Sequence, residues 1–184
     1  MTTELTQEAA HTTAMSIPVA KLNHAVLYVR DATKSADFYG RVFGFEVVES
    51  AFGGRAVFMR AAAGDNHHDL GLFSVGPEAP RPQRGSVGLY HLAWEVRTLG
   101  ALKVYADRLA GQGAMVGASD HYSTKGVYAK DPDGLEFELT WVVPPELLDA
   151  PPATPVIRPL DLDKEIARYG ADTPGAPTRG ARVG

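Results

Sequence analysis

Short runs of apolar and β-branched residues, separated by glycine-containing turns, predict strands in the first part of the chain. These runs occupy residues 21–31, 45–50, 55–61 and 69–75. After the first run, the stretch DATKSADFYGRVFGFEVV carries an apolar stripe at helical spacing. Asp31 or Thr33 is the candidate N-cap of that helix, and Gly44 is placed to end it. The pattern therefore predicts a βαβββ unit.

The same order of elements recurs after a connector rich in Pro, Gly and Arg at residues 76–86. When the sequence is aligned with itself at an offset of 67 residues, His24 matches His91 and Gly44 matches Gly111. Such self-similarity indicates an internal duplication. One unit alone is too small to cover its own sheet, so the two units are expected to pair. The predicted fold is α+β, with modules 19–76 and 86–143 paired in a cupped mixed sheet, as one domain 19–143.

Two segments outside this duplication are predicted to be extended arms. Residues 1–18 are polar, and residues 144–184 are rich in proline. The C-terminal arm contains one predicted short helix near residues 162–169, beginning at Asp161 or Asp163. Its scattered apolar residues, Ile157 among them, are expected to dock on the domain or on a second subunit. Disorder is the alternative for the last ten residues.

Composition excludes several classes of protein. The hydrophobic content of 45% is enough for a core, and the formal net charge of −4 argues against a nucleic-acid binder. The chain has no cysteine, which excludes disulfides, thiolate metal sites and cysteine nucleophiles. No apolar run approaches the length of a membrane span, and the N-terminus lacks the pattern of a secretory signal. A cytoplasmic protein is expected.

Three residues of the duplicated pattern are candidate metal ligands. His24 and His91 hold the same position in the two modules, and Glu138 lies in the last predicted strand of the second. Two histidines and one carboxylate form a facial triad that suits non-haem Fe(II). The position equivalent to Glu138 in the first module is Gly71, so a fourth carboxylate ligand is not expected there. The alternative is that each is an ordinary surface or hydrogen-bonded residue.

The stretches HAVLYVRDATKSADFYGRVFGFEVV and DPDGLEFEL resemble the vicinal oxygen chelate superfamily, which includes glyoxalases, bleomycin resistance proteins and dioxygenases. The resemblance covers about residues 20–143. The stretch HYSTKGVYAKDPDGLEFE resembles the signature of type I extradiol, catechol 2,3-dioxygenase-like enzymes. By this resemblance Tyr128 and His121 are active-site residues, and His68 in NHHDLGLF is the acid–base histidine. Ser119 and the short spacer after His121 depart from the signature.

The resemblance implies an enzyme that holds Fe(II) on His24, His91 and Glu138, and Mn(II) fits the same ligands. Such an enzyme inserts O2 into a catechol-type substrate and gives a ring-opened semialdehyde. The expected partners are a small aromatic diol, O2 and further copies of the chain in a homo-oligomer, with no nucleic acid or membrane. The alternatives are a glyoxalase-like lyase or isomerase and a non-enzymatic aromatic-binding or resistance protein. Candidate pocket residues are Val26, Tyr28, Phe52, Phe58 and Trp94.

Overall fold

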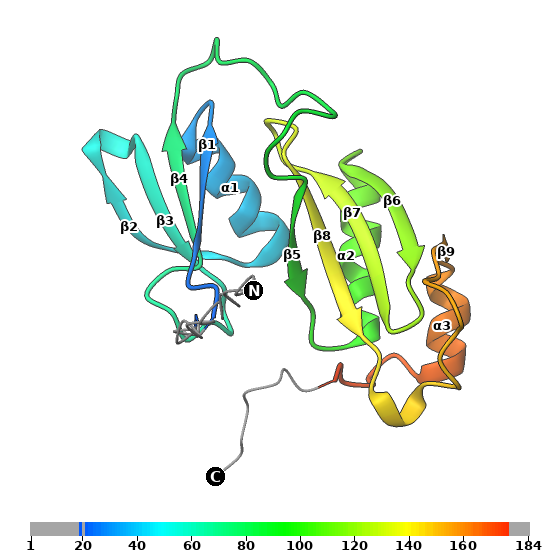
Figure 1. Cartoon of the computed structure of the whole chain (residues 1–184). Coiled ribbons are helices and arrows are strands. Elements are labelled where there is room, and N and C mark those ends of the chain that lie inside the picture. The colour runs from blue at the N-terminus through cyan, green and yellow to red at the C-terminus, as the bar shows by residue number, and fades with distance from the viewer. Residues whose placement is uncertain (1–18, 20, 177–184) are drawn as a thin grey trace, which may run out of the picture.

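The computed structural model describes residues 19 and 21–176, and its first module forms a mixed sheet with one helix behind it (Figure 1). Sheet A has the strand order β1-β4-β3-β2, in which β1 and β4 are parallel and the other neighbours antiparallel. Its elements are β1 (Ala25–Val29), α1 (Ala32–Phe43), β2 (Glu46–Ala51), β3 (Ala56–Arg60) and β4 (Leu70–Ser74).

The second module repeats this plan and adds one strand from the C-terminal arm. Sheet B has the order β5-β8-β7-β6-β9, again with a single parallel pair, β5 and β8, among the described residues. Its elements are β5 (His91–Glu95), α2 (Leu99–Gly111), β6 (Met115–Asp120), β7 (Thr124–Lys130), β8 (Glu136–Val142) and β9 (Arg158–Pro159). The predicted α+β class and the duplicated βαβββ plan are confirmed.

Local sequence fixes the ends of α1. The Asp31 carboxylate accepts hydrogen bonds from the backbone N–H groups of Thr33 and Lys34, which makes Asp31 the N-cap. Gly44 ends the helix in the left-handed conformation, with φ of 70°. The choice left open by the sequence is therefore resolved in favour of Asp31.

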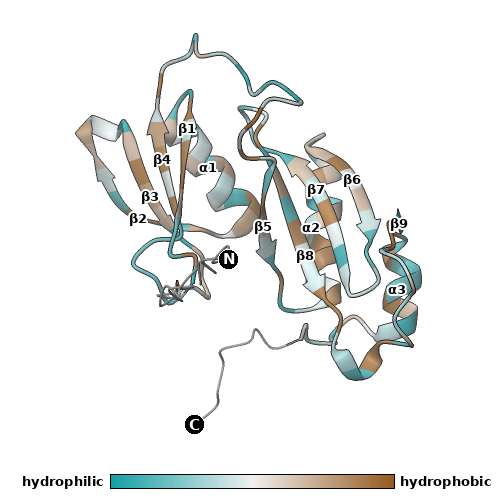
Figure 2. Ribbon diagram, in the orientation of Figure 1, coloured by the Kyte–Doolittle hydropathy of each residue, from teal (hydrophilic) through white to brown (hydrophobic). Residues whose placement is uncertain are grey.

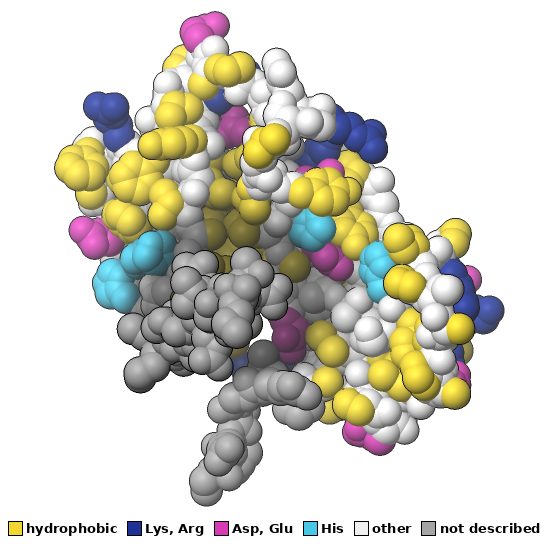
Figure 3. Space-filling view, viewed as in Figure 1, with side chains coloured by type: hydrophobic (Ala, Val, Ile, Leu, Met, Phe, Trp, Pro, Cys, Tyr) yellow, Lys and Arg dark blue, Asp and Glu magenta, His cyan; other side chains and the backbone are white. Residues whose placement is uncertain are grey.

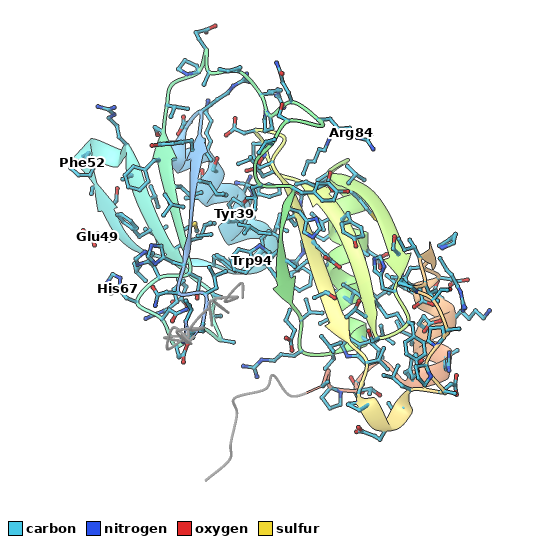
Figure 4. The ribbon with its side chains drawn as sticks, in the orientation of Figure 1. Tyr39, Glu49, Phe52, His67, Arg84 and Trp94 are labelled. Carbon is cyan, nitrogen blue, oxygen red and sulfur yellow. The ribbon has the colours of Figure 1, made fainter. Side chains whose placement is uncertain are left out.

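One hydrophobic core lies between the sheets and the helices and joins the two modules. Phe43 of α1 packs edge-on against Phe137 of β8, with ring centroids 4.9 Å apart, and also contacts Tyr105 of α2. Hydrophobic residues are concentrated in β3, β4, β7 and β8 (Figure 2). Trp94 contacts Phe45 in this core with centroids 5.1 Å apart (Figure 4), so its predicted place in a ligand pocket is wrong. Its parity on β5 directs it to the helix side.

A buried hydrogen bond also ties the modules together. The Tyr39 hydroxyl donates to Asp131, which lies in the turn between β7 and β8, at 3.3 Å. Burial and the nearby Asp131 charge raise the pKa of Tyr39 well above its ordinary value, so the hydroxyl keeps its proton. The relative placement of the modules thus rests on α1 and on this turn.

The strands β1 and β5 are the edges of their sheets nearest to each other (Figure 1). Within the described part of the chain, no ladder joins them. They run in opposite directions in the view of Figure 1. Consequently the start of β1 and the start of β5 lie at opposite ends of the space between the sheets.

The C-terminal arm folds back on the second module. It contains a short 3-10 turn (Pro145–Leu147), then β9, and then α3 (Leu162–Tyr169), which is capped by Asp161 at the predicted position. After α3, the Trp141 indole N–H donates to the Thr173 carbonyl at 3.2 Å. The predicted N-terminal arm 1–18, and most of the last ten residues, lie outside the described residues. None of the helices in the described ranges has the length and hydrophobicity that a membrane span requires.

Candidate metal and substrate site

A connected group of polar side chains lies on the face of sheet B that the helices leave open. Strand register brings Glu138 of β8 beside Tyr128 of β7 and Ala93 of β5, two residues from His91. His91 Nε2 lies 3.3 Å from Glu138 Oε2, and the Tyr128 hydroxyl donates to Glu138 Oε1 at 3.3 Å. His121 Nε2 lies 2.9 Å from the Tyr128 hydroxyl. These four residues are called the second half-site below.

The carboxylate of Glu138 fits a cation site. Glu138 is only 9% exposed, and in the described part of the chain no Lys or Arg forms an ion pair with it. A buried carboxylate is stable when it is paired with a positive group or coordinates a metal. The nearby His91 supplies an imidazole nitrogen, and its Nδ1 is buried without a hydrogen-bond partner in the described residues. An imidazole and a carboxylate together are donors for Fe(II), Mn(II) or a similar divalent ion.

Tyr128 and His121 extend this pair into a hydrogen-bond chain. Partial burial and then the Glu138 charge raise the pKa of Tyr128 to about 12, so its hydroxyl is protonated at neutral pH. Because that hydroxyl donates to Glu138, its oxygen is left to accept a hydrogen bond from His121. The tyrosine hydroxyl is thus oriented on both sides, next to the candidate ligand.

The backbone of β7 makes room for the Glu138 carboxylate at one glycine. A Cβ on Gly126 would lie 2.3 Å from Glu138 Oε1 and 3.2 Å from the Tyr128 hydroxyl. Any side chain at this position would therefore displace the carboxylate. On the neighbouring strand β6, a Cβ on Gly117 would meet nothing within 4 Å.

A second group of histidines lies beside sheet A, where β1 and β4 begin. The rings of His24 and His68 are 4.5 Å apart between centroids, and His68 also packs against Phe58. His67 Nδ1 lies 3.1 Å from His68 Nδ1, and His67 projects from the loop beside sheet A (Figure 4). Partial burial, followed by the charges of His24 and His67, lowers the pKa of His68, which favours its neutral form. His24 and His68 are called the first half-site.

The two half-sites are separate within one chain. Histidine side chains gather in two places, one beside sheet A and one over sheet B (Figure 3). Among the described residues, no three metal-binding side chains are close enough to hold one ion. His24 immediately precedes β1 and His91 begins β5, so the opposite directions of these strands keep the histidines apart. The structure thus brings His91 and Glu138 of the predicted triad together and leaves His24 in the other half-site. The assignment of the three residues as metal ligands stays a prediction.

A cavity of about 920 Å³ lies over the open face of sheet B. His91, Tyr128 and His121 line it together with Tyr90, Arg84 and Ile157. Arg84 belongs to the connector that precedes β5 (Figure 4), and Ile157 belongs to the C-terminal arm. The predicted pocket residues Val26, Tyr28 and Phe52 are exposed on the first module and do not line this cavity.

Sequence reasoning missed these cavity walls because they come from segments without periodic pattern. The connector and the arm are rich in Pro and Gly, and such segments give no register from which to place a side chain. The available signal was the apolar pair Val156 and Ile157 within a Pro-rich stretch.

Comparisons with known proteins agree on one family. Residues 21–139 match the model of the Glyoxalase/Bleomycin resistance protein/Dioxygenase superfamily. A relative named catechol-2,3-dioxygenase from Bacillus subtilis is 30% identical over 119 residues. That alignment covers 64% of this chain and 40% of the relative's length.

Solved structures are similar in fold at lower sequence identity. A glyoxylase/bleomycin resistance protein/dioxygenase domain from Frankia sp. EAN1pec has a TM-score of 0.57 and 20% identity, covering 68% of this chain and 99% of that one. A mutant of the fosfomycin resistance protein FosX from Listeria monocytogenes, complexed with Mn(II) and a dihydroxypropylphosphonic acid, has a TM-score of 0.52 and 21% identity. The match covers 66% of this chain and 90% of the FosX chain. These likenesses concern the fold.

We expect Gly126→Ala to weaken the binding of a divalent metal by about 10- to 100-fold, because the added methyl group displaces the Glu138 carboxylate. Gly117→Ala is the matched control, since it adds the same group to the neighbouring strand without a clash. Equilibrium dialysis against Mn(II), with thermal unfolding to show that both variants fold, makes the comparison. Equal affinity in the two variants would exclude Glu138 as a ligand.

Proposed function

Because the chain belongs to the Glyoxalase/Bleomycin resistance protein/Dioxygenase superfamily, we propose that it is an extradiol ring-cleaving dioxygenase. The reaction breaks the ring C–C bond next to the two hydroxyl groups of a catechol. Both atoms of O2 enter the product, a ring-opened semialdehyde, and no further reductant is needed. The proposed cofactor is Fe(II), with Mn(II) as a fitting substitute.

The observation that carries this proposal is the second half-site and its position at a cavity. A buried carboxylate, an imidazole and a protonated tyrosine meet at one place, and three of the four residues line the cavity. The similarity to a catechol-2,3-dioxygenase over 119 residues supports the reaction class. A fold shared with proteins of other named activities does not by itself choose among them.

The residues that would hold the metal are His91, Glu138 and one copy of His24. When bound, the metal lowers the pKa of a diol hydroxyl and provides adjacent positions for the substrate and O2. With Glu138 engaged by the metal, the single O–H of Tyr128 would turn from Glu138 to donate to a diol oxygen, and His121 would still hold the hydroxyl oxygen in place. His68, whose pKa is lowered, would be neutral before substrate binds and so able to take a proton from the diol and return it later.

Since His24 lies apart from His91 and Glu138, we propose that two copies of the chain complete each site. The open edges of β1 and β5 are available for contact, and Val26, Tyr28 and Tyr90 expose apolar surface beside them. An isologous pairing would place His24 and His68 of the partner subunit against the second half-site. The symmetry would produce two identical sites per dimer.

The environment of Gly71 argues against a four-ligand metal lyase. This position corresponds to Glu138 in the duplicated pattern. A Cβ on Gly71 would contact the Val26 and Phe58 side chains at 3.4–3.5 Å, so the surroundings are apolar. A carboxylate ligand has no counterpart there, and open coordination positions remain for a bidentate substrate and O2.

The anaerobically purified protein, loaded with Fe(II) and mixed with a substituted catechol in air, should consume one O2 per diol. A yellow ring-opened product should accumulate at the same rate. An oxygen electrode and absorbance spectroscopy follow the two changes together. A fully iron-loaded protein that consumes no O2 with any member of a panel of monocyclic and bicyclic diols would refute the proposed function.

We expect His68→Ala to retain iron and fold but to lower turnover by about 10²- to 10⁴-fold, because a proton-transfer group is lost. Glu138→Ala should instead lose iron, because it removes a ligand. Iron content by atomic absorption and kcat on the same samples separate the two effects. Full activity in His68→Ala, or stoichiometric iron in Glu138→Ala, would contradict the respective role.

A site shared between copies should be restored by mixing two inactive variants. His24→Ala and Glu138→Ala chains are co-expressed with different affinity tags, and the hetero-oligomer is isolated through both tags. One of its two sites is intact in the shared arrangement, so it should regain about half of the wild-type iron content and activity.

The control pairs the wild-type chain with the double variant His24→Ala/Glu138→Ala. A shared site predicts that this hetero-oligomer is inactive, because each site contains one lost ligand. A site within one chain predicts the reverse of both results. The two preparations therefore decide between the arrangements.

A further inference from the structure

The C-terminal arm lies outside the segment that matches the family, yet it forms part of the cavity. The family match ends at Leu139, whereas Ile157 lines the cavity from the far side of sheet B. We infer that residues 144–176 are a specificity element, and that Ile157 is the wall against which an apolar substituent of the substrate ring packs. This inference rests on the proposed diol substrate.

The register of sheet B determines which way Ile157 faces. Pro159 of β9 lies opposite Ser119 of β6, and Gly117 lies opposite Tyr128. Alternation along a strand puts Ile157, two residues before Pro159, on the same face as these residues. Arg158 pairs with Asp120, so continuing this register by one residue carries Ile157 toward His121, and both residues line the cavity. The arm thus places an apolar side chain beside the hydrogen-bond chain of the second half-site.

Space for a substituent lies between Tyr128 and Ile157. From the intervening strand β6, Gly117 and Ser119 line the cavity and both are small, while Val116 lines it at the irregularity in the β6–β7 register. Across this face, β7 and β9 lie two strand spacings apart on either side of β6, or roughly 10 Å. This gap lies within the cavity and is wide enough for an alkyl group or a second ring.

The size of the cavity also favours a substrate larger than catechol. A cavity of about 150 Å³ is enough to hold one benzene ring. The cavity over sheet B measures about 920 Å³. Two of its charged lining residues, Lys130 and Glu136, are opposite each other at the other end of β7 and β8, and a third, Arg84, comes from the connector. Beside His121 the wall is Ile157, so an alkyl- or aryl-substituted or fused-ring diol is the substrate class that fits.

The arm is held firmly enough to act as a wall. The Lys125 side chain, only 2% exposed, is paired with Asp120 of β6 and with Glu165 of α3, the latter at 3.2 Å. Buried charges that are paired in this way fix the geometry of the segments that carry them, because separating them leaves an unpaired buried charge. Asp120 and Lys125 precede β9 in sequence and Glu165 follows it. The ion pairs therefore hold the segment that carries Ile157 against the second module.

The test is the binding of two diols, catechol and 4-tert-butylcatechol, to the Mn(II)-loaded protein without O2. Isothermal titration measures affinity and needs no turnover. Ile157→Ala should weaken binding of 4-tert-butylcatechol by about tenfold, because apolar contact area is lost, and leave catechol within about twofold. Ile157→Trp should exclude the bulky diol and still admit catechol. Val104→Ala, at an exposed apolar position on α2 that does not line the cavity, is the control and should change neither affinity.

Ile157 is 76% exposed, so both substitutions should leave folding intact. Equal effects on the two diols, or no effect on either, would overturn the inference, as would a wild-type protein that binds neither diol. The outcome is distinct from that of the function test. A wild-type protein that shows this selectivity in binding but consumes no O2 when loaded with Fe(II) would refute the dioxygenase and keep the role of Ile157.

Discussion

The site depends on one buried carboxylate that forms no ion pair with a Lys or Arg of the described residues. Glu138 is buried in sheet B, and its polar partners among those residues are His91 and Tyr128 rather than a Lys or Arg. A folded chain tolerates such a group when something else supplies positive charge. The absence of a side chain at Gly126 leaves space for this group, and partial burial together with the Glu138 charge raises the pKa of Tyr128.

Much of the fold could be predicted because its signals are local. The Asp31 cap, the Gly44 stop and the alternation in β8 each act within a few residues. The duplication could be found because it repeats residue types at a constant offset. The same reasoning reached α3 in the arm, since Asp161 and the amphipathic residues after it are again a local signal.

The assembly of the site could not be predicted in this way. Equal positions in two modules suggest proximity, but distance depends on how the modules pack, and that is decided by contacts such as Phe43 with Phe137. The opposite directions of β1 and β5 then separate His24 from His91. His68 shows the converse. Strand parity does not bring it to the open face, yet the loop before β4 turns its ring toward His24.

Lys125 has a consequence for how this protein is best handled as a recombinant fragment. The point where family likeness stops, at Leu139, is not where the packing stops, since the lysine's ammonium group reaches a carboxylate on α3. A fragment cut to the family boundary would leave that ammonium group paired with Asp120 alone, truncate β8, which runs to Val142, and expose β6 as a sheet edge open to intermolecular pairing. Insolubility of such a fragment would reflect the chosen cut and not the chemistry of the intact molecule.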